Sequence, residues 1–546
     1  MTRRQRMGQA TTIEPGATPA GTVAATPACG PRTSGGRERI AWMALLLVTL
    51  AIHLVALGAR PPHHDEAVHG DFGHNLLVDP SQYHYDPTYH GPLLFYTLAP
   101  IFAVFGESNF TARLYPALAG VALVMLPLAL RRRIGPGTAW WTGVVLALSP
   151  SFLYFSRFAR NDVPVVLFTA VALVLFLLVR RRRWKVIPWI GVAAACHAIS
   201  KETFYVLLPL LAVAAWAVAV RGGVWLSVRR TFAWIDRYRL AVGVALCWFF
   251  VLCMAAYTVG FTRPEDWFFP GKAISYWYGQ HTIQRVGGPW HFHLPRLALY
   301  EFLPLVAATV WVVRRRARLR PIEVFCFAWG LASLAMFAYL GEKVPWLLVH
   351  QVVPFVILAG AQLSRTFGRH GRWWSRTIAA TSLVATAWSA LASSYLYPAI
   401  TTSDPHAELI IFVQTTPEAG HLAELGIELA RTRPGELIAA VDGEAAWPLS
   451  WQWKKISVWW AKPGKDQKPL LIVVDPGKED EILAGLSPGW RKEQIPLRAW
   501  WVEDWSRATP GTLISWFLTR RAWSPVGATD IVVLTAPGVQ GRGRWN

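Results

Sequence analysis

The hydrophobic residues of this chain gather in long blocks that are separated by short polar segments. A helix needs about 20 apolar residues to cross the hydrocarbon core of a membrane, and most of these blocks approach that length. The pattern therefore predicts a polytopic α-helical membrane protein with about eleven transmembrane helices. The predicted spans are 40–58, 112–130, 138–155, 163–180, 186–200, 204–221, 239–259, 296–313, 322–340, 345–362 and 377–396.

Basic residues orient these helices, because cytoplasmic loops are enriched in Lys and Arg. Arginines precede the first span, which places the N-terminus in the cytoplasm and the large first loop, 59–92, outside. The "RRR" run at 131–133 must return to the cytoplasm, yet the intervening block 93–105 has only 13 residues, too few to span comfortably. We therefore expect 93–105 to be a helix in the outer interface. Later arginine runs then fall inside, and the C-terminus lies outside.

The two ends of the chain differ from its apolar middle, 39–397. Residues 1–38 are rich in Thr, Pro, Gly, Ala and Arg without periodicity, which predicts a disordered cytoplasmic tail. From residue 398, short β-rich runs such as "ELIAAVDG" and "PLLIVVDPG" flank a helical pattern, "PEAGHLAELGIELART". This alternation predicts an extracytoplasmic α/β domain over 398–546.

Composition excludes some other classes of protein. The net charge is +21, but only 16% of the residues are charged and 53% are hydrophobic, and most of the cations lie in short runs between apolar blocks. Without a recognition motif, such runs indicate membrane topology and argue against nucleic acid as a partner. No GxxxxGK[ST] sequence occurs, which argues against an ATP-driven transporter. The five cysteines lack the spacing of a disulfide framework or zinc site.

Ionisable residues cluster at the predicted external ends of the spans, where charge is costly and usually has a role. A carboxylate can deprotonate a hydroxyl acceptor or ligate a metal, and Arg or Lys can hold a phosphate. Both kinds at one face suit a lipid-linked phosphate donor. The candidates are Asp65, Glu66, His90, Arg157, Arg160, Asp162, Lys201, Glu202, the histidines of 281–293, Glu342 and Lys343.

Several segments resemble a known family. "DEAVHGDF" (65–72), "YDPTYHGPLLFYTLAPIFAVFGESNFTARLYPALAG" (85–120) and "LSPSFLYFSRFARND" (148–162) are similar to the GT-C superfamily of polyprenyl-phosphate-sugar-dependent glycosyltransferases, in its protein O-mannosyltransferase and aminoarabinose-transferase branch. "GEKVPWLLVHQVVPFVILAG", "VQTTPE" and "DGEAAWPLSW" resemble a prokaryotic group named for flippase-associated activity in N-glycosylation gene sets. The resemblance covers about 40–460 and implies a GT-C fold in the cell (inner) membrane.

The resemblance also implies roles for the carboxylates. Asp65 matches an acidic residue of the first external loop that acts as a general base or orients the acceptor, and Glu66 matches its supporting neighbour. Asp162 matches the second external motif and would orient these groups. Asp65, Asp162 and Glu342 are the candidate ligands if a divalent metal is needed, although no cofactor is certain. The alternatives are a solvated loop or helix start for Asp65 and Glu66, and a structural ion pair for Asp162.

A second set of residues is expected to bind the phosphate of the donor, a polyprenyl-phosphate-linked sugar. His90 occupies the place of a (K/H)PPL motif, with Gly91 where relatives often have proline. The alternative for Lys201 is a lysine that snorkels to the interface, and that for Lys343 is a local pair with Glu342. The phosphate-binding candidates are His90, Arg157, Arg160, Lys201 and Lys343.

The function that follows is transfer of a sugar from the lipid donor to a glycan, lipid or protein acceptor at the external face. Two other classes stay open on sequence alone. One is a non-catalytic factor that assists translocation or assembly of lipid-linked oligosaccharide. The other is a scaffold whose outer domain recruits glycosylation enzymes.

The predicted topology can be tested with reporter fusions. A reporter fused at Gly137 should be active in the cytoplasm, whereas one fused at Ser403 should be active outside, because the arginine runs fix the direction of each span. A cytoplasmic signal at Ser403 would overturn the arrangement.

Overall fold

The computed structural model describes residues 34–179, 183–283, 287–369, 371–464 and 466–539. The predicted tail, 1–38, lies outside the described residues apart from 34–38, which belong to helix α1 (Ser34–Leu54). The chain divides into two compact units, Met1–Ala44 and Leu45–Asn546. The candidate site belongs entirely to the second unit.

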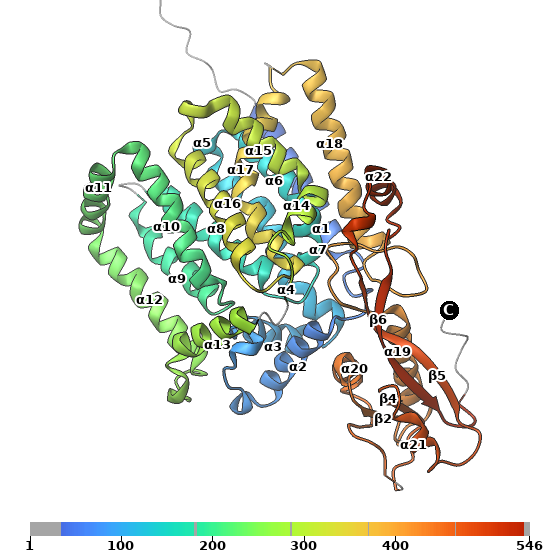
Figure 1. The fold of residues 1–546 in the computed structure, drawn as a ribbon. Coiled ribbons are helices and arrows are strands. Elements are labelled where there is room, and N and C mark those ends of the chain that lie inside the picture. Colours follow the sequence, from blue (N-terminus) through green and yellow to red (C-terminus); the bar gives the residue numbers. More distant parts are fainter. Residues whose placement is uncertain (1–33, 180–182, 284–286, 370, 465, 540–546) are drawn as a thin grey trace, which may run out of the picture. The chain divides into compact units, whose positions relative to one another are not determined.

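Each apolar block that was predicted to span the membrane contains helix (Figure 1). Two blocks are broken where Pro127 and Pro150 begin new helices, as expected for a residue without a backbone N–H. The helices are α4 (Asn109–Met125), α5 (Pro127–Ile134), α6 (Pro136–Leu148), α7 (Pro150–Ser156), α8 (Asp162–Leu178), α9 (Ile187–Ala198), α10 (Thr203–Gly222), α11 (Val224–Arg237), α12 (Arg239–Tyr257), α13 (Phe269–Ile283), α14 (His293–Tyr300), α15 (Phe302–Arg315), α16 (Pro321–Tyr339), α17 (Leu348–Thr366) and α18 (Trp373–Leu391).

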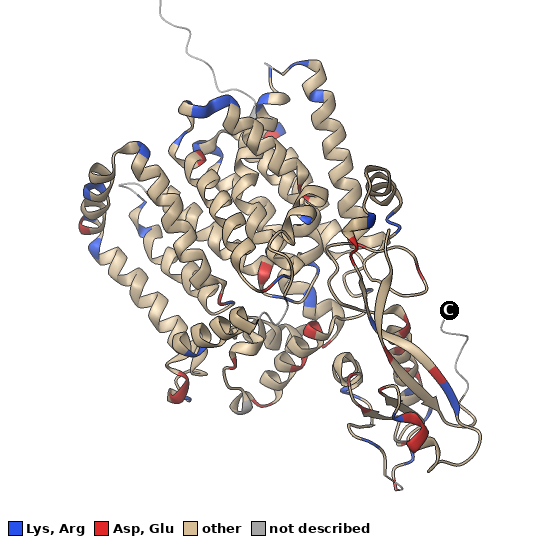
Figure 2. Ribbon diagram, viewed as in Figure 1, with Lys and Arg blue, Asp and Glu red and all other residues tan. Residues whose placement is uncertain are grey.

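Fewer of these helices are long enough to cross a membrane than the sequence pattern indicated. Within the described residues, five helices are long and apolar enough, and a sixth qualifies if α14 and α15, which meet at 88°, form one span. The predicted number of eleven spans is therefore not confirmed. Figure 2 shows Lys and Arg concentrated at the upper ends of helices such as α15 and α18, with Asp and Glu mostly below and in the C-terminal domain.

The first predicted external loop, 59–92, is largely helical. Helix α2 (His64–Val78) begins at a capping box, in which the His63 ring accepts from the Asp65 N–H and Glu66 accepts from the His63 N–H. Helix α3 (Leu93–Phe105) matches the predicted helix 93–105; its interfacial position stays a prediction. Close packing of α2 on α3 needs Gly73, since a Cβ there would lie 2.8 Å from the Leu98 Cβ.

The C-terminal part forms one six-stranded sheet with the order β1-β5-β6-β4-β2-β3. Strands β2, β3 and β4 are parallel, and the other pairs are antiparallel. Apolar side chains of β4 are buried on both faces, which explains the uninterrupted run "LLIVV". The elements are β1 (Gln414–Thr415), α19 (Pro417–Thr432), β2 (Ala439–Asp442), α20 (Ala446–Trp453), β3 (Val458–Trp459), β4 (Leu471–Val474), α21 (Glu479–Leu483), β5 (Arg491–Trp501), α22 (Pro510–Thr519) and β6 (Val526–Thr535).

This sheet domain holds the segment around Asp65 from two sides. On one side, Gln414 Nε2 donates to the Pro61 carbonyl at 3.0 Å, and Thr415 Oγ1 donates to the Pro62 carbonyl at 2.6 Å. On the other side, α20 packs against α2. The start of α2, which carries Asp65, therefore lies between two anchor points supplied by the same domain.

The second anchor point is the ring of Trp451. A Cβ added at Gly70 would lie 2.6 Å from this ring, so only glycine permits the contact. The indole Nε1 donates to Asn109 Oδ1 at 2.9 Å, and the neighbouring Ser450 Oγ donates to Asp71 Oδ2 at 2.9 Å. Trp451 thus fastens α20 to both α2 and α4.

Substituting Trp451 by alanine should destabilise the purified protein by about 3–5 kcal/mol, because a buried Trp is replaced by a cavity. Thermal unfolding in detergent would measure the loss. Trp459→Ala removes an indole that is 44% exposed and should change the melting temperature little. Equal melting temperatures for the two variants would contradict a fastening role of Trp451.

Candidate active site

Asp65 lies in the first turn of α2, and its carboxylate is partly open to solvent. The side chain is 29% exposed, whereas that of its partner Arg160 is 6% exposed. Asp65 Oδ2 forms an ion pair with the Arg160 guanidinium, and Oδ1 lies 3.1 Å from His64 Nε2. The Arg160 guanidinium also lies over the Trp346 ring, 3.8 Å from its centroid, so stacking fixes its plane.

The same arginine leads from Asp65 to a second, fully buried acid. Asp162, the first residue of α8, has Oδ2 3.5 Å from Arg160 Nε and Oδ1 2.7 Å from Lys201 Nζ. His350 Nε2 lies 3.4 Å from the same Oδ1. Four predicted site residues, Asp65, Arg160, Asp162 and Lys201, therefore form one chain of ion pairs, hereafter the ion-pair chain.

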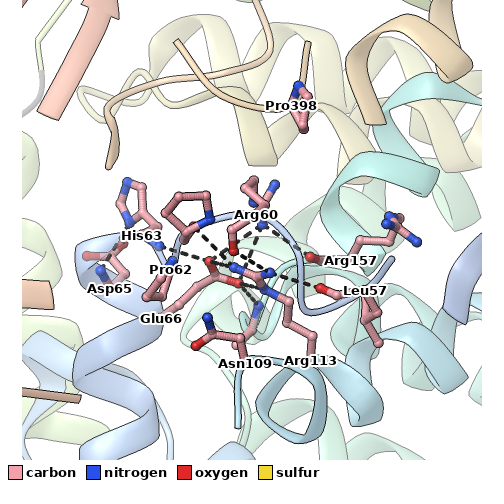
Figure 3. A network of polar contacts seen from close by, with 12 residues as sticks. Leu57, Arg60, Pro62, His63, Asp65, Glu66, Asn109, Arg113, Arg157 and Pro398 are labelled. Atoms are coloured by element: carbon pink, nitrogen blue, oxygen red, sulfur yellow. Dashed lines mark hydrogen bonds and ion pairs between the residues drawn. The ribbon is translucent and has the colours of Figure 1, made fainter. Parts of the chain in front are cut away.

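Glu66 points away from this chain into a network of its own (Figure 3). Its carboxylate accepts two bonds of 2.7 Å from Arg113 and bonds from the backbone N–H groups of His63 and Ala159 at 2.9 and 2.8 Å. Arg60 Nη2 lies 3.5 Å away. Burial alone would raise the pKa of Glu66, but the Arg113 and Arg60 guanidinium groups lower that pKa to about 2. With its oxygens so occupied, Glu66 positions neighbouring segments, and direct catalysis by it stays a prediction.

Two predicted phosphate-binding residues instead cap helices. Arg157 donates from Nη1 and Nη2 to backbone carbonyls at the C-terminal end of α1, at 2.9–3.2 Å. Lys343 Nζ donates to three carbonyls at the end of α16. The last carbonyls of a helix lack intrahelical partners and need other hydrogen-bond donors. A sequence motif does not show that Arg157 and Lys343 supply these donors. Among the ion pairs of the described residues, none joins Lys343 to Glu342, which is partly exposed.

His90 lies close to Lys201, but its ring contacts Glu202, the residue that follows Lys201. Its Nδ1 is 2.8 Å from Glu202 Oε2, and its ring stacks on Trp277 with centroids 5.1 Å apart. Gly91 donates its N–H to the Ser200 carbonyl at 3.2 Å. A Cβ at this position would lie 2.3 Å from the Ile199 carbonyl oxygen, which explains glycine where proline was expected. The structure thus brings His90 to the site's edge.

A metal could be held at the start of α2. Ligand atoms of His63, His64 and Asp65 lie within 4.8 Å of one another, and this group includes neither Asp162 nor Glu342, the other predicted ligands. The buried His63 Nε2 has no hydrogen-bond partner among the described residues. Two imidazoles and one carboxylate fit a zinc-like ion.

An apolar cavity of about 800 Å³ lies among the helices and is lined by α4, α5, α6, α8, α10, α11, α16 and α17. A smaller cavity shares Trp329 and Val353 with it and reaches His350, which contacts Asp162. The smaller cavity, which has both apolar and polar lining residues, therefore reaches the buried end of the ion-pair chain. The arrangement can hold a long hydrocarbon chain beside charged groups.

Sequence reasoning missed the residues that support these groups. Arg113, Trp346 and His350 each stand alone in apolar stretches. An isolated ionisable residue in such a stretch is itself a signal of a role, and it would have selected Arg113 and His350. The contact of Arg160 with Trp346 joins two segments far apart in the chain and has no local signature.

The depressed pKa of Glu66 makes a prediction for stability against pH. The folded pKa, about 2, lies below the usual 4.5, so its stabilising contribution is complete above pH 4.5 and is lost as pH falls toward 2. The loss should amount to about 3 kcal/mol. Glu66→Gln should be less stable than the wild type at pH 7 and should lose less stability on acidification. Parallel pH profiles of melting temperature would contradict this assignment.

Known proteins resemble the chain in part of its sequence. Residues 89–248 match a family model described as dolichyl-phosphate-mannose-protein mannosyltransferase. An undecaprenyl phosphate-α-4-amino-4-deoxy-L-arabinose arabinosyl transferase of Pseudomonas aeruginosa (strain LESB58) is 27% identical over 280 residues, covering 48% of this chain and 47% of the relative. The match thus spans about half the length of the curated relatives.

Solved structures resemble nearly the whole chain in fold. ArnT from Cupriavidus metallidurans bound to undecaprenyl phosphate aligns with a TM-score of 0.61 at 16% identity, covering 92% of this chain and 99% of ArnT. Its apo state gives a TM-score of 0.56 at 17% identity, covering 92% and 100%. The structure consists of apolar helices followed by a C-terminal sheet domain, as the sequence predicted. The chain therefore has the ArnT-like fold of the GT-C glycosyltransferases, as its motifs predicted.

Proposed function

We propose that this chain transfers a sugar from a polyprenyl-phosphate donor to an acceptor at the extracytoplasmic face of the cell membrane. The observation that carries the proposal is the ion-pair chain, in which a partly exposed carboxylate is joined to buried cations. A hydroxyl acceptor can reach Asp65, while Arg160 and Lys201 provide positive charge behind it. This is the pairing of base and anion-binding groups that the reaction needs.

In the proposed reaction, the acceptor oxygen attacks the anomeric carbon of the donor sugar. The bond from that carbon to the phosphate oxygen breaks, polyprenyl phosphate leaves, and the acceptor proton passes to Asp65. Arg160 and Lys201 stabilise the negative charge that grows on the phosphate. Asp162 contacts both cations and so keeps them aimed at one place.

The apolar cavity supports a lipid-linked donor over a soluble sugar nucleotide. Its volume of about 800 Å³ and its almost wholly apolar lining suit a polyprenyl tail, and the smaller cavity that shares two of its lining residues includes His350, which contacts Asp162 of the ion-pair chain. The names of the similar proteins also support a lipid-linked donor, since each name mentions undecaprenyl phosphate or dolichyl phosphate. The sheet domain would lie outside the membrane, with the N-terminus in the cytoplasm.

A variant of Asp65 tests the proposal directly. Asp65→Asn keeps the size of the side chain but removes the base, so transfer from a purified polyprenyl-phosphate sugar should fall about 10²–10⁴-fold. The matched control is Asp71→Asn on the same helix, which should retain activity because the new amide oxygen can still accept the hydrogen bond from Ser450. Full transfer by Asp65→Asn would refute the assignment.

Glycan analysis in cells separates catalysis from translocation. Mass spectrometry of cells that carry Asp65→Ala should show glycans lacking one sugar if the protein is a transferase. Loss of all surface glycan together with accumulation of a lipid-linked precursor would instead establish a translocation factor.

A further inference from the structure

A third cavity, of about 60 Å³, is lined by the two arginines that bind Glu66, among other residues, and is hereafter the arginine cavity. Its lining includes Arg60, Arg113, Arg157, Ser394 and Tyr395. A cavity needs about 10–15 Å³ to hold one water molecule, so this one has room for several waters or for one small oxyanion. Neither Asp65 nor any other member of the ion-pair chain lines it.

The arginine cavity carries more positive charge than its surroundings balance. The three arginines are 1–8% exposed, and the only carboxylate bonded to them among the described residues is Glu66. Three guanidinium groups and one carboxylate leave a formal charge of +2. Buried charges are normally paired, so this excess calls for an anion.

Backbone carbonyls offset only part of the excess. Arg157 bonds to the C-terminal carbonyls of α1, and Arg113 Nη1 bonds to the carbonyls of Leu57 and Arg60. A helix C-terminus is worth roughly half a negative charge. More than one unit of positive charge therefore stays uncompensated around the cavity.

Two buried donors of the lining have no partner among the described residues. They are Arg60 Nε and Ser394 Oγ, in side chains of residues that are 8% and 5% exposed. Such groups are rare in folded proteins and are commonly satisfied by water or a ligand. The Arg60 guanidinium is held between the rings of Tyr154 and Phe158, 4.9 and 4.8 Å from their centroids, so its direction is fixed in advance.

We propose that the arginine cavity binds a phosphate-class oxyanion, with Arg60 Nε and Ser394 Oγ as donors and Arg113 and Arg157 as flanking charges. The site is separate from the ion-pair chain, and it stands whether or not the proposed transfer reaction is correct. Planar guanidinium groups suit phosphate oxygens better than a point charge does. The phosphate can come from a lipid headgroup or from solution.

The test uses the full chain in detergent with inorganic phosphate as the probe. Phosphate should raise the melting temperature saturably, while chloride at the same ionic strength should not. Ser394→Ala removes the Oγ donor, and Arg60→Lys removes the Nε donor together with the planar guanidinium, while both variants keep the charge. Each should weaken phosphate binding about 10- to 100-fold, because a hydrogen bond to a charged group contributes that much to affinity. Arg263→Lys, a matched change at a partly exposed arginine, should bind phosphate like the wild type.

A second experiment distinguishes the phosphate of a lipid headgroup from a free phosphate ion. Vesicles that contain phosphatidic acid, compared with vesicles of phosphatidylcholine, should stabilise the wild type more than Ser394→Ala if a lipid headgroup occupies the cavity. A response to inorganic phosphate alone would identify a soluble ion. If neither probe stabilises the wild type, or if both donor variants respond as the wild type does, the proposal is overturned.

Discussion

The buried ion pair between Glu66 and Arg113 is the interaction on which the rest of the site depends. One carboxylate receives donors from the start of α2, from α4, from the turn before α8 and from the segment before α2. Removing one partner of such a pair leaves an uncompensated buried charge and costs about 3–5 kcal/mol. Since Asp65 is the residue next to Glu66, its position follows from a network that includes its backbone N–H but not its carboxylate.

Charge in this protein is organised as two neighbouring systems with different tasks. The ion-pair chain alternates acids and bases, so it is nearly neutral and ends at a carboxylate open to solvent. The arginine cavity keeps an excess of cations with unused donors. Arg157 belongs to the second system although its motif joins it to Arg160. Arg157 and Arg160 thus belong to different sites, because the turn between α7 and α8 directs their side chains apart.

The sequence predicted those features best that depend on a local pattern, such as hydrophobic periodicity or a short motif. Periodicity and length gave the helices at 93–105 and 417–432, and motif resemblance selected the residues of the ion-pair chain. Helix α2 was considered only as an alternative for Asp65 and Glu66, because its buried face includes Ala67, Gly70 and Gly73, which carry almost no hydrophobic signal. The capping role of Lys343 was missed because it depends on where α16 ends, a property of the folded chain. The number of spans was not confirmed: Pro150 divides one predicted span into two short helices, whereas the break at Pro127 leaves Asn109–Ile134 as a single candidate span.

The two anchor points that hold the start of α2 also bear on the order of folding. Residues 61–71 are synthesised early, but their partners Gln414 in β1 and Ser450 in α20 lie 353 and 379 residues later in the chain. Chains fold from the N-terminus as they are made, so helices of the apolar part can assemble while this segment still lacks its outer contacts. The Asp65 carboxylate is therefore set in place only after the sheet domain has emerged, and an incompletely made chain would lack these outer contacts.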